Sequence, residues 1–303
     1  MLVDLLRSAI ADRLDDNTGL SLSGGLDSST VAALLPRPVP TFTGYYEEDG
    51  FDERYYARLA ARAGGHWRNH EVVIRPRDFV DHFEAMCRHL RPPIMGMGTF
   101  GQWMVARYAS SYVGALLSGE GSDELFGGYA RQMIVAGEDP PEGYEDYVLP
   151  AGYPTRLAAA LAYDYERLPD LLAVDDQMTG AWGLKARAPF TDQRVVDYAL
   201  ALPSWQRVGK RHLRERVRGI VPDAIIDRRD KRGFPIPLVQ WTQDEPVRSF
   251  VMDRIGHLPD LAQPWDRAWW YALVEKAWTS SDAAKPEIRT DTAASATSTT
   301  SSR

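Results

Sequence analysis

Two glycine-rich segments, each placed directly after a short apolar run, constrain the fold of this chain more than any other feature of its sequence. The run 20–22 leads into the segment 23–29, SGGLDSS, and the run 113–117 leads into the segment 118–129, SGEGSDELFGGY. A buried strand that ends in a tight glycine turn and continues as a helix is the repeating unit of a parallel sheet. Because ligands of such sheets bind where the strands end, we expect both segments to lie at a binding site.

Strands and helices alternate along the first half of the chain. Some stretches carry apolar residues at helical spacing, and short apolar runs separate these stretches. The pattern predicts the α/β class, with a parallel sheet that has helices on both faces. The expected helices are 3–14, 28–35, 51–65 and 77–90, and the expected strands are 20–22, 41–43, 71–74 and 113–117.

After about residue 155 the strand signals stop, and the remainder is predicted to be helical with proline-rich connections. We expect one domain over residues 1–282, with an α/β part at about 1–150 and a helical half at about 151–282. Residues 283–303 are rich in Ser, Thr and Ala and lack apolar periodicity, which predicts a disordered tail.

Charge and composition exclude several classes of protein. The net charge of −7 argues against a nucleic-acid partner or a membrane surface. No apolar run reaches the length of about 18 residues that a transmembrane helix needs, and residues 1–10 are a poor signal peptide. The single cysteine, Cys87, excludes an intramolecular disulfide, and its place in a helical stretch predicts a packed thiol. We therefore expect a cytoplasmic protein.

The first glycine-rich segment has the composition of a pyrophosphate cradle. Gly24 and Gly25 let the backbone turn sharply and approach a ligand. The helix that follows offers free N–H groups and the positive end of its dipole. The hydroxyl groups of Ser23, Ser28 and Ser29 add further donors.

Asp27, within the same segment, predicts a magnesium ion, because a carboxylate beside phosphates is repelled unless a cation lies between them. The segment is not a Walker loop, since the Gly-Lys-Ser/Thr ending is missing. A cradle without that lysine suits a leaving pyrophosphate, and hence cleavage at the α-phosphorus of ATP.

Three acids separated by glycines follow the last predicted strand: Glu120, Asp123 and Glu124. Such a cluster either binds a metal ion or contains a carboxylate with a raised pKa. We expect Asp123 to join Asp27 on the magnesium ion. We expect Glu120 to face the acceptor, where it orders or deprotonates an amine nucleophile.

These two segments resemble those of the synthetase domain of glutamine-hydrolysing asparagine synthetases and their relatives, the β-lactam synthetases and lasso-peptide cyclases. The first is similar to the family's Ser-Gly-Gly-x-Asp-Ser loop, and the second to its Ser-Gly-Glu-Gly-Ser-Asp-Glu segment and the Gly-Gly-Tyr that follows. The resemblance covers about residues 15–245 and also includes 51–65 with His70 and Glu71, 168–192, 209–215 and 231–238. It implies an adenine-nucleotide α-hydrolase-like fold and an acyl-adenylate mechanism that uses ATP and Mg²⁺.

The resemblance adds a lysine to the site. Lys210 lies where the family places a lysine in a lysine-x-x-leucine-arginine-glutamate stretch, and its implied role is to stabilise negative charge in the adenylate-forming and amide-forming transition states. Glu120 and Lys210 are thus the expected catalytic residues, and Asp27 and Asp123 the expected magnesium ligands. The nucleotide contacts that we expect are Leu22, Ser23, Gly24, Gly25, Asp27, Ser28, Ser29, Gly119 and Lys231.

Many other cations surround Lys210 in the sequence, and for most of them a solvated helix face is the expected place. They are Arg207, Arg211, Arg214, Arg216, Arg218, Arg228, Arg229 and Arg232.

The sequence also departs from the family. No N-terminal cysteine nucleophile is present, since Leu2 follows Met1, so we expect no glutamine hydrolysis by that route. Ammonia then comes free or from a separate glutaminase subunit, or the nucleophile is another amine. The segment 91–103 carries Ile94, Met95 and Met97, which favour either a less polar pocket for a larger acyl group or simple core packing. Its GxGxxG pattern at 96–101 follows no predicted strand and does not indicate a dinucleotide site.

The favoured function is therefore an ATP-dependent ligase that adenylates a small-molecule or peptide carboxylate and transfers the acyl group to ammonia or another amine. Asparagine formation with free or partner-supplied ammonia is the alternative within this class. A nucleotide-binding scaffold without catalysis is the alternative from another class. A tRNA-modifying relative is disfavoured by the negative net charge and the single cysteine.

Overall fold

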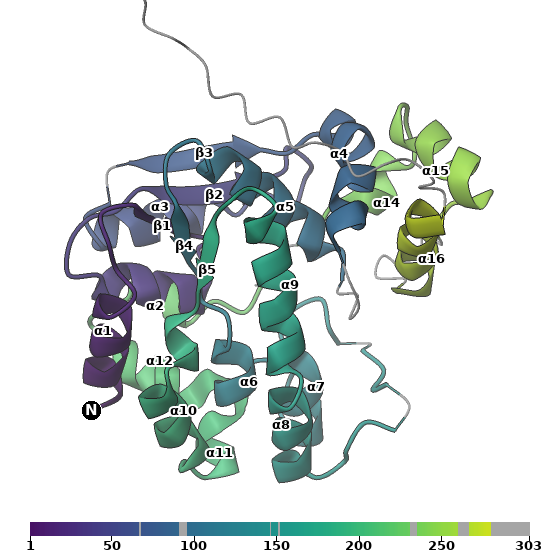
Figure 1. The fold of residues 1–303 in the computed structure, drawn as a ribbon. Coiled ribbons are helices and arrows are strands. Elements are labelled where there is room, and N and C mark those ends of the chain that lie inside the picture. Colours follow the sequence, from purple (N-terminus) through teal and green to yellow (C-terminus); the bar gives the residue numbers. More distant parts are fainter. Residues whose placement is uncertain are drawn as a thin grey trace, which may run out of the picture.

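A five-stranded parallel sheet lies at the centre of the computed structural model, which describes residues 1–66, 68–90, 96–145, 147–150, 152–230, 235–259 and 267–279 (Figure 1). Leu20 in the central strand lies opposite Thr41 on one side and Leu117 on the other. The order across the sheet is β3-β2-β1-β4-β5. The strands are β1 (Thr18–Ser21), β2 (Thr41–Tyr45), β3 (Asn69–Val73), β4 (Ala115–Leu117) and β5 (Lys185–Arg187).

The strand order changes direction at β1, which has β2 and β3 on one side and β4 and β5 on the other. The connections that follow β1 and β4 therefore leave the carboxyl edge of the sheet side by side. This is the position at which doubly wound sheets bind their ligands. Both connections are glycine-rich segments that the sequence singled out, so the topology brings them together.

Seven helices of the described residues belong to the first half of the chain: α1 (Leu2–Ala11), α2 (Leu26–Leu34), α3 (Arg54–Ala63), α4 (Pro76–His89), α5 (Gly98–Ala109), α6 (Ser122–Phe126) and α7 (Ala130–Val135). The second half contains α8 (Leu157–Tyr165), α9 (Leu168–Gly180), the 3₁₀ turns η1 (Pro189–Thr191) and η2 (Val208–Lys210), α10 (Gln193–Leu200), α11 (Ser204–Arg207), α12 (Arg211–Val217), α13 (Asp223–Ile226), α14 (Leu238–Trp241), α15 (Val247–Ile255) and α16 (Arg267–Thr279).

Helices cover both faces of the sheet (Figure 1). Helices α2 and α3 pack on one face, while α5 and α9 pack on the other. The reason is visible in β4, where successive side chains point to opposite faces. Leu117 belongs to the apolar cluster that contains α1, α2 and α3, and Leu116 to the one that contains α5.

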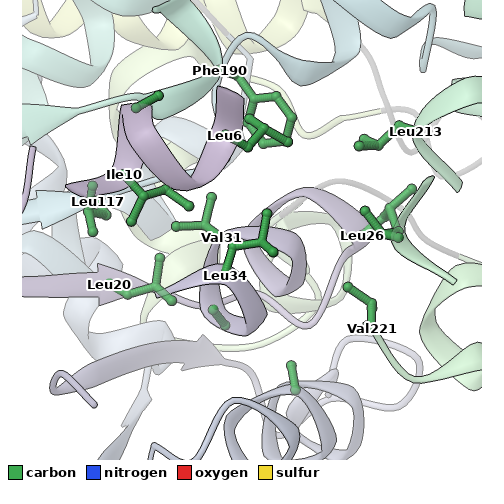
Figure 2. Packing of buried hydrophobic residues seen from close by; sticks show 14 of the residues in the cluster. Leu6, Ile10, Leu20, Leu26, Val31, Leu34, Leu117, Phe190, Leu213 and Val221 are labelled. Atoms are coloured by element: carbon green, nitrogen blue, oxygen red, sulfur yellow. The ribbon is translucent and has the colours of Figure 1, made fainter. Parts of the chain in front are cut away.

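One apolar cluster joins the sheet to the helical half (Figure 2). Leu6 and Ile10 of α1 and Val31 of α2 are fully buried, and Phe190 and Leu213 from the second half of the chain lie beside them. Burial of one such side chain stabilises the fold by about 1.5–3 kcal/mol. The connections after β1 and β4 are thus fixed between two halves that share a core.

A second cluster, rich in aromatic residues, joins α4 and α5 to α14, α15 and α16. Cys87 of α4 lies in it and has no solvent exposure. Burial raises the pKa of its thiol, which disfavours the reactive thiolate. The prediction of a packed thiol is confirmed.

The predicted elements of the first half are present with shifted ends. The predicted strand 20–22 lies at Thr18–Ser21, and the predicted helix 51–65 at Arg54–Ala63, where Gly64 forms the C-cap. The prediction that strands stop after about residue 155 was wrong, because β5 (Lys185–Arg187) pairs with β4 at the edge of the sheet. This strand is short and partly exposed, so it lacks the apolar run by which the other strands were found.

Across the described residues, no helix combines the length and the apolar composition that crossing a membrane requires. The tail predicted to be disordered, 283–303, lies outside the described residues.

Candidate active site

The first glycine-rich connection is a tight turn between β1 and α2. Gly24 has a left-handed φ of 75°, and a Cβ at this position would lie 2.5 Å from the main-chain nitrogen of Ala57. The Ser23 main-chain N–H donates to Ser28 Oγ at 3.2 Å, and the two serine hydroxyls lie 3.1 Å apart. Among the described residues, no side chain caps α2, so the first N–H groups of this helix have neither a helical acceptor nor a capping side chain.

The second connection packs directly against the first. A Cβ at Gly119 would lie 2.6 Å from Asp27 Cβ. Gly121 has a φ of 89° and is the N-cap of the short helix α6, which carries Asp123 in its first turn. Glycine is needed at both positions, because one makes a close approach and the other a left-handed turn.

Lys210 connects the two loops. Its Nζ lies 2.7 and 2.6 Å from the two carboxylate oxygens of Asp27 and 2.7 Å from Asp123 Oδ1. Burial lowers the pKa of its ammonium, but the carboxylates of Asp123 and Asp27 more than offset this and raise it. Lys210 is therefore a positively charged group. It also has a left-handed φ of 56°, which is uncommon for a residue with a Cβ.

A cavity of about 360 Å³ opens on one side of this cluster. Part of its wall is apolar and comes from the sheet and α5, and the rest is polar or acidic. No Lys, Arg or His is among the described residues that line it. The lining residues are Ser21, Leu22, Ser23, Asp27, Ser28, Phe42, Gly44, Gly96, Gly98, Thr99, Gln102, Val105, Ala106, Leu116, Ser118, Gly119, Glu120, Asp123, Leu171, Asp175 and Thr179. We call it the sheet cavity.

A second cavity, of about 340 Å³, opens on the other side, and we call it the cationic cavity. Asp27 and Asp123 line both cavities, so the two meet at these carboxylates. Its cationic lining residues are Arg131, Lys210, Arg214, Arg228 and Arg229.

The expectation of a solvated face holds for some of the arginines near Lys210 and is wrong for others. Arg211 and Arg229 are exposed. Arg228 is not, because its side chain is 5% exposed, donates to Glu53 at 2.5 Å and lies over the ring of Tyr56. Arg207 is also buried.

Arg207 holds α6 in position through hydrogen bonds to its main-chain oxygens. Its Nε donates to the main-chain oxygen of Leu125 at 2.7 Å, and its Nη2 donates to that of Glu124 at 3.3 Å. Both carbonyls lie in the last turn of α6, where no further helical N–H is available to them. The arginine therefore fixes the helix that presents Asp123.

Glu120 lies on the sheet-cavity side of the cluster and is partly exposed. Gln102 Nε2 lies 3.4 Å from its Oε1. Burial raises the pKa of Glu120 well above its usual range, and the nearby charge of Asp175 is the next contribution. Glu124 is buried, accepts a hydrogen bond from the Tyr129 hydroxyl, and has a pKa raised to about 7, chiefly by burial and then by Asp123.

Asp175 in α9 is a site residue that the sequence analysis missed. It is 8% exposed and lines the sheet cavity together with residues of both glycine-rich loops. Burial, and then the neighbouring Asp176, raises its pKa to about 7. A signal was present, since Asp175 lies seven residues after Leu168 and three before Met178, which places an acid on the buried face of a helix.

This raised pKa predicts a pH-dependent stability. The folded chain holds a proton on Asp175 that the unfolded chain has already lost, so stability falls as the pH rises from about 4 to about 7. The full shift corresponds to at most about 4 kcal/mol. Asp175→Asn removes this loss. The free energy of unfolding of the variant in urea, minus that of the wild type, should therefore increase from pH 5 to pH 7. Parallel curves for the two proteins would contradict the prediction, and Asp170→Asn, at an exposed acid of the same helix, is the control.

The structure brings most of the predicted site residues together. Leu22, Ser23, Asp27, Ser28, Gly119, Glu120 and Asp123 line the sheet cavity, and Gly25 and Lys210 line the cationic cavity. Gly24 shapes the turn, and Ser29 is buried in α2; neither lines the two cavities. Lys231, Arg232, Ile94 and Met95 lie outside the described residues, while Met97 packs against the aromatic cluster.

Comparison with known proteins identifies one family. A family model described as asparagine synthase matches residues 1–164 and 149–297. Asparagine synthetase (glutamine-hydrolyzing) 1 of Bacillus subtilis is 27% identical over 83% of this chain and 53% of its own length. Asparagine synthetase (glutamine-hydrolyzing) of Gallus gallus is 31% identical over 68% of this chain and 36% of its own length. The chain thus spans about half the length, or less, of these curated relatives.

The family model matches nearly the whole chain and includes both glycine-rich loops and Lys210. The parallel sheet, with its ligand edge at the β1–β4 junction, agrees with the fold that the sequence resemblance implies. This chain belongs to the asparagine synthase family.

Proposed function

We propose that this chain is an ATP-dependent amide-forming ligase that activates a carboxylate as an acyl-adenylate and transfers the acyl group to an amine. Membership of the asparagine synthase family supports an ATP-dependent reaction of this class. One observation carries the proposal: the cluster of Lys210, Asp27 and Asp123 lies where the sheet cavity, whose described lining has no cationic side chain, meets the cationic cavity.

The two cavities suit the two ends of ATP. Apolar side chains such as Leu22 and Phe42 in the sheet cavity offer surfaces for the adenine base. The arginines of the cationic cavity offer partners for the pyrophosphate. The α-phosphorus then lies near the shared carboxylates and Lys210. The first turn of α2, with its free N–H groups, supports binding of the phosphates.

The reaction then has two steps. A carboxylate oxygen of the substrate attacks the α-phosphorus, and the bond to pyrophosphate breaks. The amine nitrogen next attacks the acyl carbon, and the bond to AMP breaks. In both steps negative charge grows beside Lys210, whose buried ammonium stabilises it without reorganisation of solvent. Glu120, which also lines the sheet cavity, orders the amine or accepts its proton.

Asp27 and Asp123 are the residues that would hold a magnesium ion. Both already face one cation, Lys210 Nζ, so their oxygens converge. Among the described side chains, no third acid, histidine or cysteine joins them to complete a protein-made site. This pair fits magnesium, which takes one or two carboxylates together with phosphate oxygens and water. When bound, the ion would neutralise phosphate charge.

The acid that is activated distinguishes two candidates. The relatives named above are asparagine synthetases, which supports formation of asparagine with free or partner-supplied ammonia. We favour another acid, because the described lining of the sheet cavity offers no cation to a second carboxylate such as that of aspartate. We place the reaction in the cytoplasm, which supplies its ATP.

Release of pyrophosphate tests this function. The wild-type chain should release pyrophosphate from ATP and magnesium when the matching acid is supplied from a panel of small-molecule and peptide carboxylates, with and without ammonia. Asp123→Ala should lower this rate by at least about 10²-fold. Asp16→Ala removes a fully exposed acid elsewhere and should leave it unchanged. ATP binding without release for any acid would favour the nucleotide-binding scaffold, and aspartate as the best acid would favour asparagine formation.

A further inference from the structure

Four carboxylates line the sheet cavity, and they form two different pairs. Asp27 and Asp123 share the ammonium of Lys210. Glu120 and Asp175 have no cation of their own among the described residues, and Glu120 receives only the long contact from Gln102. The second pair therefore consists of two carboxyl groups that the described part of the chain leaves without a cation.

Asp175 is the more informative member of this pair. It is 92% buried, which normally requires a partner for a carboxylate. Within the described part of the chain, no hydrogen-bond donor or cation contacts its side chain, although the side chain lines the cavity. Leu171 and Thr179, one turn before and one turn after it on α9, line the same cavity. The helix thus presents an unpartnered acid to the space in which the substrate binds.

Burial is the main reason that the pKa of Glu120 is raised, and the carboxylate of Asp175 is the largest charged contribution. The two acids therefore lie close enough to repel each other when both are ionised. A cation between them would remove this repulsion. Among the described residues, the cations of the site lie on the other side of Asp27 and Asp123, in the cationic cavity, so a cationic ligand is what would stabilise the ionised form of both acids.

We propose that Glu120 and Asp175 together form the binding site for the amino group of the amine substrate, which enters as an ammonium ion. This inference rests on the proposed function and names the charge state of its second substrate. Ammonium fits better than a divalent metal, because the neighbours of the pair, Thr99, Gln102 and Thr179, are neutral and no phosphate is expected at this end of the cavity.

The chemistry of amide formation also requires two proton acceptors. An ammonium ion must lose one proton before its nitrogen attacks the acyl carbon. It loses a second when the carbon–nitrogen bond is complete and the carbon–oxygen bond to AMP breaks. The amide carries neither proton, and AMP leaves with its phosphate ionised. Glu120 and Asp175 accept one proton each and return them to water afterwards, so charges and atoms balance.

Binding of methylammonium alone tests the site without turnover. With a chelator present, methylammonium chloride should raise the Tm of the wild type above its value in sodium chloride of equal ionic strength, by about 3 °C at ten times its Kd. Asp175→Asn and Glu120→Gln should abolish this difference. Asp176→Asn, at the exposed neighbour of Asp175, should retain it. Equal Tm values in the two salts for the wild type would overturn the proposal, as would a methylammonium shift that both Asp175→Asn and Glu120→Gln retain.

Turnover supplies a second, charge-selective test. Methylamine is an ammonium near neutral pH, whereas hydroxylamine has a similar size and is mostly uncharged. With the acid that supports pyrophosphate release, Asp175→Asn should raise the KM for methylamine by about tenfold or more and that for hydroxylamine by less than about threefold. Asp175→Glu should partly restore the value for methylamine. Equal losses for both amines would overturn the inference. Failure of pyrophosphate release in the wild type, with the methylammonium shift intact, would instead overturn the proposed ligase function alone.

Discussion

Replacement of Lys210 by methionine should lower the rate of acid-dependent pyrophosphate release by about 10²- to 10³-fold. Methionine has a similar length and keeps the apolar contacts of the stem, so the variant removes chiefly the charge. The ammonium contacts both Asp27 and Asp123, at 2.6 to 2.7 Å, and no other described residue takes that position. Without it, the charge that grows on the phosphate and acyl oxygens faces two carboxylates. The measurement is the rate of pyrophosphate release at saturating ATP and acid.

A neighbouring cation provides the control. Arg211 is the next residue, but it is exposed and pairs with Glu138 on the surface. Arg211→Met should change the rate by less than about twofold, since exposed ion pairs contribute little. Lys210→Arg should recover only part of the activity, because the planar guanidinium does not fit the space of a compact ammonium. A Lys210→Met enzyme with a near wild-type rate would mean that this lysine is structural.

Replacement of Arg131 by methionine should lower the free energy of unfolding by about 3–5 kcal/mol. Arg131 donates to both oxygens of Asp164, at 2.7 to 3.2 Å, and its guanidinium lies 4.0 Å from the centre of the Tyr129 ring. Asp164 is 1% exposed and also accepts from the Tyr153 hydroxyl at 2.5 Å. Loss of the arginine leaves a buried carboxylate without its cation. Urea unfolding of the two proteins at neutral pH measures the difference.

The matched control is Arg167, which stacks on the ring of Tyr163 at 3.4 Å but is exposed and pairs with no buried acid among the described residues. Arg167→Met should cost less than about 1 kcal/mol. The double variant Arg131→Met/Asp164→Leu should recover much of the lost stability, because no charge then remains buried. Equal losses for Arg131→Met and Arg167→Met would show that the buried pair contributes nothing beyond a surface contact.

The central part of the fold could be predicted because its strands are buried on both faces. Such strands read as apolar runs, and the glycine turns after 20–22 and 113–117 marked where two of them end. The edge strand β5 was not predicted from the sequence, because it lacks an apolar run. Its end residues, Lys185 and Arg187, are held by pairing with β4 and by contacts of Arg187 with Asp15 and Thr18. Those contacts join residues about 170 positions apart, which no local pattern reports.

In the candidate site, too, local sequence predicts some residues, and only tertiary contacts reveal the others. Asp27, Glu120 and Asp123 lie in two short segments with distinctive chemistry, and the strand order brings these segments together. Asp175 comes from a helix whose local sequence shows only an acid between apolar residues. Its importance depends on what faces it across the cavity. Arg207 and Arg228 looked like members of a solvated basic stretch, and only tertiary contacts distinguish them from exposed neighbours such as Arg211.

The meeting of the two cavities at Asp27 and Asp123 has a consequence for the timing of turnover. On the proposed function, pyrophosphate and the amine would occupy opposite sides of those carboxylates, so neither molecule would stand in the path of the other. The amine can already be seated when ATP is cleaved. A reactive acyl-adenylate would then form with its nucleophile in place, and water would have no interval in which to compete.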